Sequence, residues 1–190
     1  GTESVANTTA TTALNINASA VINALIIMGN AGNNLITGTA YSDQLDGGDG
    51  SDVYLINATT HHTQAEITDT GNMGIDEVRF AATAASTLTL FAGDTGIDQV
   101  VIGAKTKTDA VTTGTVALNV NASAVTNSLK LIGNNGPNTL LGTAHADVLD
   151  GRSGIDSLNG NNGADIYFIS SAAEHTAGEI ADTGTSGIDE

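Results

Sequence analysis

A nine-residue spacing recurs along this chain and constrains its fold more than any other feature. Between residues 29 and 56, glycine returns at every ninth position, and a polar or acidic residue and a large apolar residue return with it. Neither the 3.6-residue period of an α-helix nor the two-residue alternation of a single strand produces this spacing. The three series are Gly29, Gly38 and Gly47; Asn34, Asp43 and Asp52; and Ile36, Leu45 and Tyr54.

The repeated unit has the pattern G-x-x-G-x-D-x-U-x, in which U is a large apolar residue. Glycine at positions 1 and 4 permits turn conformations that a side chain would block. Positions 7 to 9 are typical of a short strand, with the residue at position 8 facing a core. Full copies lie at 47–55, 71–79, 93–101, 151–159 and 160–168. Asn replaces Asp at 29–37 and 133–141, and the second glycine is missing at 38–46 and 142–150.

The chain also contains a longer internal duplication. Residues 14–34 resemble residues 118–138, and residues 52–77 resemble residues 165–190. The second offset exceeds the first by one nonapeptide. We therefore expect two repeat units of a longer tandem array. They are 1–117, partial at its start with a cluster at 29–56, and 118–190, truncated at its end with a cluster at 133–169.

The composition limits the possible fold classes and the possible binding partners. The formal net charge is −16, from 21 acidic and 5 basic residues, and such a surface disfavours nucleic acid and anionic membranes as partners. No apolar run approaches the ~18 residues of a membrane-spanning helix. Aromatic residues make up 3% and cysteine is absent, so the core is thin and no disulfide supports it. Together with the spacing of the nonapeptides, the sequence predicts an all-β solenoid with coils of about 18–24 residues, stabilised by something besides its core.

These units resemble the calcium-binding nonapeptide of RTX (haemolysin-type) proteins, closely over 29–56 and 133–169. The resemblance implies a right-handed parallel β-roll with several Ca²⁺ ions held between turns one coil apart. It also implies a large secreted bacterial protein, such as a cell-surface adhesin, a surface-layer component or an extracellular matrix fibre, exported by type I secretion. Carboxylate and carbonyl oxygens are the ligands that Ca²⁺ prefers.

The family pattern implies calcium ligands at the acidic position of each unit. It pairs Asp147 with Asp165, Asn138 with Asp156, and Asn34 with Asp52, and the first pair is expected to bind best because both members are acidic. Asp43 lacks an acidic partner two nonapeptides further on, near His62, so a weak or incomplete site is expected there. Asp76 and Asp98, which are separated by more than two nonapeptides, are expected to bridge two longer coils. Further expected ligands are Gly47, Asp49, Gly142, Gly151 and Gly160.

No nucleophile or converging acid–base pair is visible in the sequence. His62 and His175 occupy equivalent positions in the two units, without a catalytic arrangement, and are expected on the surface. We therefore expect a non-enzymatic calcium-binding structural module that folds outside the cell. Neighbouring copies of the chain are a further expected partner, because open coils expose strand edges. The alternatives are an RTX secretion and folding region of a secreted enzyme or toxin, or a carbohydrate- or surface-binding module.

Overall fold

The computed structural model describes residues 8–103, 111–169 and 175–190. These residues form short parallel strands and one 3₁₀ turn, η1 (Thr59–His61), and they contain no α-helix. No helix among them has the length and apolar character needed to cross a membrane. The strands are β1 (Asn15–Asn17), β2 (Ile26–Met28), β3 (Leu35–Thr37), β4 (Gln44–Asp46), β5 (Val53–Ile56), β6 (Glu77–Phe80), β7 (Ser86–Thr89), β8 (Gln99–Ile102), β9 (Leu118–Asn121), β10 (Lys130–Ile132), β11 (Thr139–Leu141), β12 (Val148–Asp150), β13 (Ser157–Asn159) and β14 (Ile166–Tyr167).

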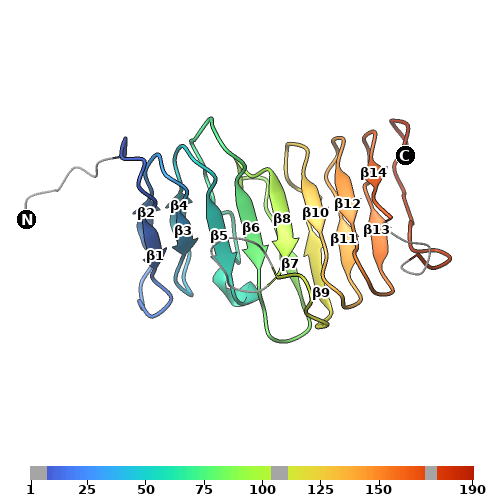
Figure 1. Cartoon of the computed structure of the whole chain (residues 1–190), viewed down its shortest axis with the longest axis horizontal. Coiled ribbons are helices and arrows are strands. Elements are labelled where there is room, and N and C mark those ends of the chain that lie inside the picture. Colours follow the sequence, from blue (N-terminus) through green and yellow to red (C-terminus); the bar gives the residue numbers. More distant parts are fainter. Residues whose placement is uncertain (1–7, 104–110, 170–174) are drawn as a thin grey trace, which may run out of the picture.

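The strands stack as the coils of a β-solenoid, in sequence order from one end of the molecule to the other (Figure 1). One face is an eight-stranded parallel sheet with the order β1-β3-β5-β6-β8-β10-β12-β14. The opposite face has two parts, β2-β4 and β7-β9-β11-β13. Single bridges extend these parts, from Leu45 to Ile67, from Thr68 to Thr95 and from Leu158 to Ile180. The predicted all-β solenoid with parallel strands is therefore confirmed.

Coil length follows the nonapeptide where the nonapeptide is continuous. Paired positions differ by 18 between β3 and β5, and again from β10 through β12 to β14. The step is 24 from β5 to β6 and 22 from β6 to β8, within the predicted range. The step from β8 to β10 is 31, because Gln99 pairs with Lys130. This coil exceeds the predicted range, since its sequence contains no continuous nonapeptide to set its length.

The core is a double column of apolar side chains, one from each face of each coil. The predicted inward position of the nonapeptide is confirmed at Leu45, Tyr54 and Leu149, which are all buried. Fully burying such a side chain contributes about 1.5–3 kcal/mol. The column on the long sheet contains Ile36, Tyr54, Val78, Val100, Leu131 and Leu149, and the facing column contains Ile27, Leu45, Ile67, Leu88, Val120, Leu140 and Leu158.

The turns use the left-handed backbone region at two positions of the nonapeptide. Position 4 is glycine, with φ of +126° at Gly50 and +147° at Gly154. Position 2 also has positive φ, at +84° in Gly48, 67° in Arg152 and 69° in Asn161. A residue with a Cβ is strained in this region unless it is Asn or Asp, so Arg152 is the least favourable occupant of the three. The tight turn therefore depends on backbone conformation as well as on side chains.

Leu149→Ala is expected to lower the free energy of unfolding by about 2–5 kcal/mol, because it opens a cavity in a narrow column of side chains. Ile155→Ala is the matched control, since Ile155 is 74% exposed; it should change stability by less than about 0.5 kcal/mol. Urea unfolding with calcium present measures both. Equal effects of the two substitutions would contradict the inward orientation of position 8.

Candidate metal sites

The carboxylates at the acidic position of the nonapeptide form a ladder of hydrogen bonds between coils. Each ladder carboxylate lies just before a strand and accepts a hydrogen bond from a backbone N–H one coil earlier. This contact joins each of the three sequence-predicted pairs. The N···O distances are 2.6 Å from Asn34 to Asp52, 2.8 Å from Asn138 to Asp156 and 2.8 Å from Asp147 to Asp165.

The same ladder continues through the longer coils. The backbone N–H of Asp52 donates to Asp76 Oδ1 at 2.8 Å, and that of Asp76 donates to Asp98 Oδ2 at 2.8 Å. The structure therefore brings Asp76 and Asp98 together, as expected, and it also places Asp76 beside Asp52. Asp49 has a different position: it is exposed, and its Oδ1 accepts a hydrogen bond from the backbone N–H of Asn72.

The second oxygen of several ladder carboxylates has no hydrogen-bond partner. Oδ2 of Asp52, Asp156 and Asp165 is buried without a partner among the described residues. A buried polar atom left unsatisfied costs about 1–3 kcal/mol, and more when the group is charged. Each of these oxygens therefore requires a proton or a cation beside it.

The glycines at position 1 border the second carboxylate oxygens. A Cβ on Gly151 would lie 2.5 Å from Asp156 Oδ2, and a Cβ on Gly142 would lie 2.5 Å from Asp147 Oδ2 and 2.8 Å from the Gly160 carbonyl oxygen. Side chains at these positions would fill the space next to the carboxylate oxygens. The donors around that space are carboxylate and carbonyl oxygens, and an oxygen-only set of this kind fits Ca²⁺.

Burial raises the pKa of the ladder carboxyls. The pKa of Asp52 and that of Asp156 rise to about 6, and that of Asp76 rises to about 7, with desolvation as the largest cause and neighbouring carboxylates adding to it. Burial also raises the pKa of Asp147 and Asp165. Near pH 5 and without a cation, the folded turns therefore hold protons that the unfolded chain has released.

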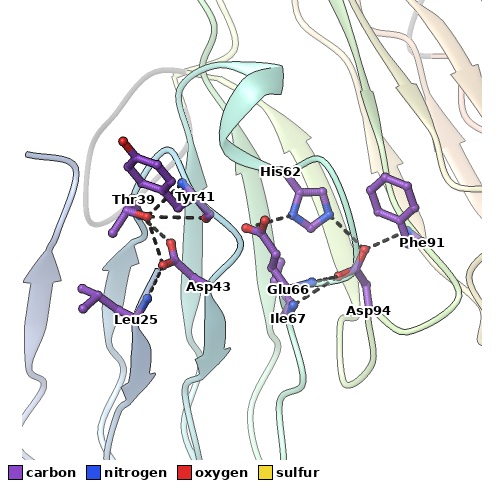
Figure 2. Close-up of polar contacts among 9 residues, drawn as sticks. All are labelled: Leu25, Thr39, Tyr41, Asp43, His62, Glu66, Ile67, Phe91 and Asp94. Carbon is purple, nitrogen blue, oxygen red and sulfur yellow. Dashed lines mark hydrogen bonds and ion pairs between the residues drawn. The ribbon is translucent and has the colours of Figure 1, made fainter. Parts of the chain in front are cut away.

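The turn at Asp43 differs because protein donors surround its carboxylate. Asp43 accepts hydrogen bonds from the backbone N–H of Thr39 at 2.5 Å, from Thr39 Oγ1 at 3.0 Å and from the backbone N–H of Leu25 at 2.8 Å (Figure 2). The carboxyl group of Glu66 lies within electrostatic reach, and burial, with a contribution from the charge of Asp43, raises the pKa of Glu66 to about 7. That a cation binds weakly at Asp43 stays a prediction.

Asp147 has the same surroundings in the second unit. It accepts from the backbone N–H of Thr143 at 2.6 Å, from Thr143 Oγ1 at 3.0 Å and from the backbone N–H of Leu129 at 2.7 Å. In the pair expected to bind best, the oxygen without a hydrogen bond therefore belongs to Asp165. The threonine that follows position 1 in both turns supplies the extra donors, and the sequence expectation did not include it.

His62 lies between the carboxylates of Glu66 and Asp94. Its Nε2 is 2.9 Å from Asp94 Oδ2, and its Nδ1 is 3.9 Å from Glu66 Oε2 (Figure 2). Asp94 also accepts from the backbone N–H groups of Glu66, Ile67 and Phe91. His62 is 4% exposed, so the expectation of a surface histidine is wrong for this residue. The burial depends on Asp94, which is distant in the sequence and comes close only when the coils stack.

Two acidic residues that the nonapeptide pattern does not include lie beside the ladder. Asp69 groups with Asp52 and Asp76, and Asp182 groups with Asp165 and Asp189. Sequence reasoning missed them because they lie two positions before the first glycine of the next unit. A signal was present, since the aligned segments 52–77 and 165–190 both contain the letters D-T-G at these positions.

Comparison with known families supports the assignment of these turns. Residues 28–55 and 132–167 match the family model described as RTX calcium-binding nonapeptide repeat (4 copies). These two segments of the chain therefore resemble RTX repeats, a class that binds calcium and is typical of secreted proteins. No curated protein and no solved structure gives a significant match to the chain.

Without calcium, the fold is expected to be more stable at pH 5 than at pH 8. Asp52, Asp76 and Asp156 have a pKa of about 6 to 7 in the folded chain, against 3.8 for an unperturbed Asp, so the folded state binds protons more tightly. Their contribution to stability is present at low pH and is lost as pH rises through 6 to 7. Circular dichroism of calcium-free protein at the two pH values measures this as the amount of β signal, and a stronger β signal at pH 8 than at pH 5 would contradict it.

His62→Ala is expected to lower the free energy of unfolding by about 1–3 kcal/mol, because Asp94 loses a buried partner. His175→Ala is the matched control. His175 is the equivalent residue of the second unit, but its side chain is 43% exposed and contacts Glu179 at 3.2 Å. That substitution should cost less than about 0.5 kcal/mol. Urea unfolding in excess calcium compares the two, and equal costs would contradict the role given to burial.

Proposed function

We propose that this chain is a non-enzymatic structural module of a secreted bacterial protein of the cell surface or extracellular matrix, and that it folds when it binds calcium outside the cell. The observation that carries the proposal is the unpaired, buried Oδ2 of Asp52, Asp156 and Asp165, each beside a glycine. The RTX repeats at residues 28–55 and 132–167 support calcium as the cation.

The residues that would hold calcium are the paired ladder residues and nearby backbone carbonyls. They are Asp147 with Asp165, Asn138 with Asp156, Asn34 with Asp52, and Asp76 with Asp98, together with the carbonyls of Gly47, Gly142, Gly151 and Gly160. Asp43 would contribute a weak site, and Asp49 lies on the exposed side of its turn. Calcium, when bound, would supply positive charge to oxygens that have no hydrogen-bond partner among the described residues.

The charge of the chain explains why such a module would respond to extracellular calcium. With a net charge of −16 and a thin core, stacked acidic turns repel one another unless a cation or protons neutralise them. Extracellular calcium modules bind at ~10⁻⁴–10⁻³ M. Binding to the folded state alone stabilises it by about 2.7 kcal/mol per site at a hundredfold excess over Kd. The chain would therefore stay unfolded in the cell and fold after export.

Circular dichroism during a calcium titration tests the proposal, with magnesium as the control. A cooperative rise of β signal with calcium and not with magnesium is expected. Asp156→Asn should raise the calcium midpoint by up to about tenfold, the factor that corresponds to about 1.4 kcal/mol of binding free energy. The hydrogen bond between coils should survive, because an amide oxygen can accept the backbone N–H of Asn138 in place of Asp156 Oδ1.

Asn138→Asp is the reciprocal variant of the same pair. It adds a charge where Asp156→Asn removes one, and it should lower the calcium midpoint. A β spectrum that forms fully in calcium-free buffer at neutral pH and does not respond to calcium would overturn the proposal. The turns would then be structural in the absence of metal.

A further inference from the structure

Three buried carboxylates converge where the coil of β5 meets the coil of β6. Asp52, Asp69 and Asp76 each offer a carboxylate oxygen, and these three oxygens lie within 4.8 Å of one another. The residues are 0%, 7% and 5% exposed. Asp52 Oδ2 is buried there without a hydrogen-bond partner among the described residues. Three charged carboxylates this close and this buried repel one another strongly unless protons or a cation neutralise them.

The third carboxylate comes from a local lengthening of the chain. From Leu45 to Tyr54, the inward residues of consecutive strands are one nonapeptide apart, whereas the interval from Ile67 to Val78 is two positions longer. Asp69 belongs to this longer connection. Two nearby groups fix its side chain: the Tyr54 hydroxyl donates to its Oδ2 at 2.6 Å, and the backbone N–H of Gly71 donates to its Oδ1 at 2.8 Å.

A similar arrangement recurs in the second repeat unit, although there Asp165 is buried, Asp182 is half-buried and Asp189 is exposed. Asp165, Asp182 and Asp189 form the second group, again with one oxygen from each within 4.8 Å of the others. The backbone N–H of Asp165 donates to Asp189 Oδ1 at 3.0 Å, and that of Gly184 donates to Asp182 Oδ1 at 2.8 Å. Oδ2 of Asp165, a residue that is fully buried, has no partner among the described residues. Two copies of one geometry, each with an unpaired buried oxygen, indicate a built site.

We propose that these two groups are three-carboxylate calcium sites, one per repeat unit, that bind the ion more tightly than the two-residue sites of the nonapeptide turns. The proposal rests on the proposed calcium-dependent folding and extends it to residues outside the matched segments 28–55 and 132–167. Asp69 and Asp182 supply the additional ligand, and Tyr54 is a positioning residue for Asp69.

A matched set of substitutions isolates the third carboxylate. Asp69→Asn with Asp182→Asn removes it from both sites. Asp46→Asn is the control, because Asp46 also accepts a hydrogen bond from the backbone N–H two positions on, at 3.1 Å from Gly48. Asp46 does not belong to the three-carboxylate group. Each of these substitutions removes one charge and keeps the side-chain shape.

Isothermal titration calorimetry with calcium measures the number of bound ions and their affinity, and circular dichroism measures the β signal. Unmodified protein should bind two ions per chain more tightly than the rest. The Asp69→Asn/Asp182→Asn protein should lose at least about tenfold in affinity for those two ions, and still gain β signal at high calcium. Asp46→Asn should keep both tight ions. Unchanged tight binding in the double variant would overturn the inference and leave calcium-dependent folding intact, whereas no calcium binding by any of the proteins would overturn both.

Terbium luminescence tests the sites without altering a carboxylate, in case the double variant fails to fold. The chain has three tyrosines and no tryptophan, so tyrosine alone transfers energy to bound Tb³⁺. Tyr54→Phe with Tyr167→Phe should remove most of the emission, because these hydroxyls lie beside Asp69 and Asp182. Tyr41→Phe should keep it, because Tyr41 is half exposed in another turn. Emission that depends on Tyr41 instead would contradict the inference.

Discussion

The stacking of this solenoid depends on one carboxylate oxygen at the sixth position of each acidic turn. That oxygen accepts the backbone N–H of the coil before it, at 2.6–2.8 Å in the three nonapeptide pairs. The second oxygen lies beside the glycine at position 1, and no protein donor among the described residues reaches it in Asp52, Asp156 and Asp165. Stacking and the proposed ion binding are thus divided between two atoms of one carboxylate.

An asparagine at the same position makes a different set of hydrogen bonds with its side chain. The side-chain oxygens of Asn34 and Asn138 accept a backbone N–H within their own turns, from Asn30 and Asn134. The amide nitrogen of Asn138 then donates to the carbonyl oxygen of Leu118 in the coil before it. Both polar atoms of the asparagine side chain therefore have protein partners, whereas the aspartate one coil later leaves one oxygen without a protein donor among the described residues.

The chain satisfies its crowded turn carboxylates in two different ways. In the nonapeptide turns the free oxygens face space lined by oxygens, which suits a cation from solution. Around Asp94 the protein supplies its own partners, since His62 and three backbone N–H groups surround that carboxylate. The solenoid therefore contains turns whose carboxylates keep an oxygen without a protein donor among the described residues, and a turn whose carboxylate is satisfied by protein groups.

Much of the fold follows from the sequence because the nonapeptide specifies turn, strand and inward residue together. The period predicted parallel coils, the buried position of residues such as Leu45 and Leu149, and the pairs one coil apart. Where the period breaks, prediction fails for a physical reason. The long step between β8 and β10 has no repeated turn to define it. The burial of His62 and the convergence of Asp69 on Asp52 depend on which residues face each other across coils of unequal length, and the nonapeptide pattern does not encode that.

The ladder of hydrogen bonds has a direction. In each pair the acceptor belongs to the later coil and the N–H belongs to the earlier one, as in Asp52 N–H to Asp76 and Asp147 N–H to Asp165. The turn N–H of one coil therefore has its hydrogen-bond acceptor only when the next coil is stacked on it. Each coil therefore depends on the coil that follows it for one turn hydrogen bond, and the solenoid is polar along its axis: its two ends present different groups, a turn N–H at one and a carboxylate oxygen at the other.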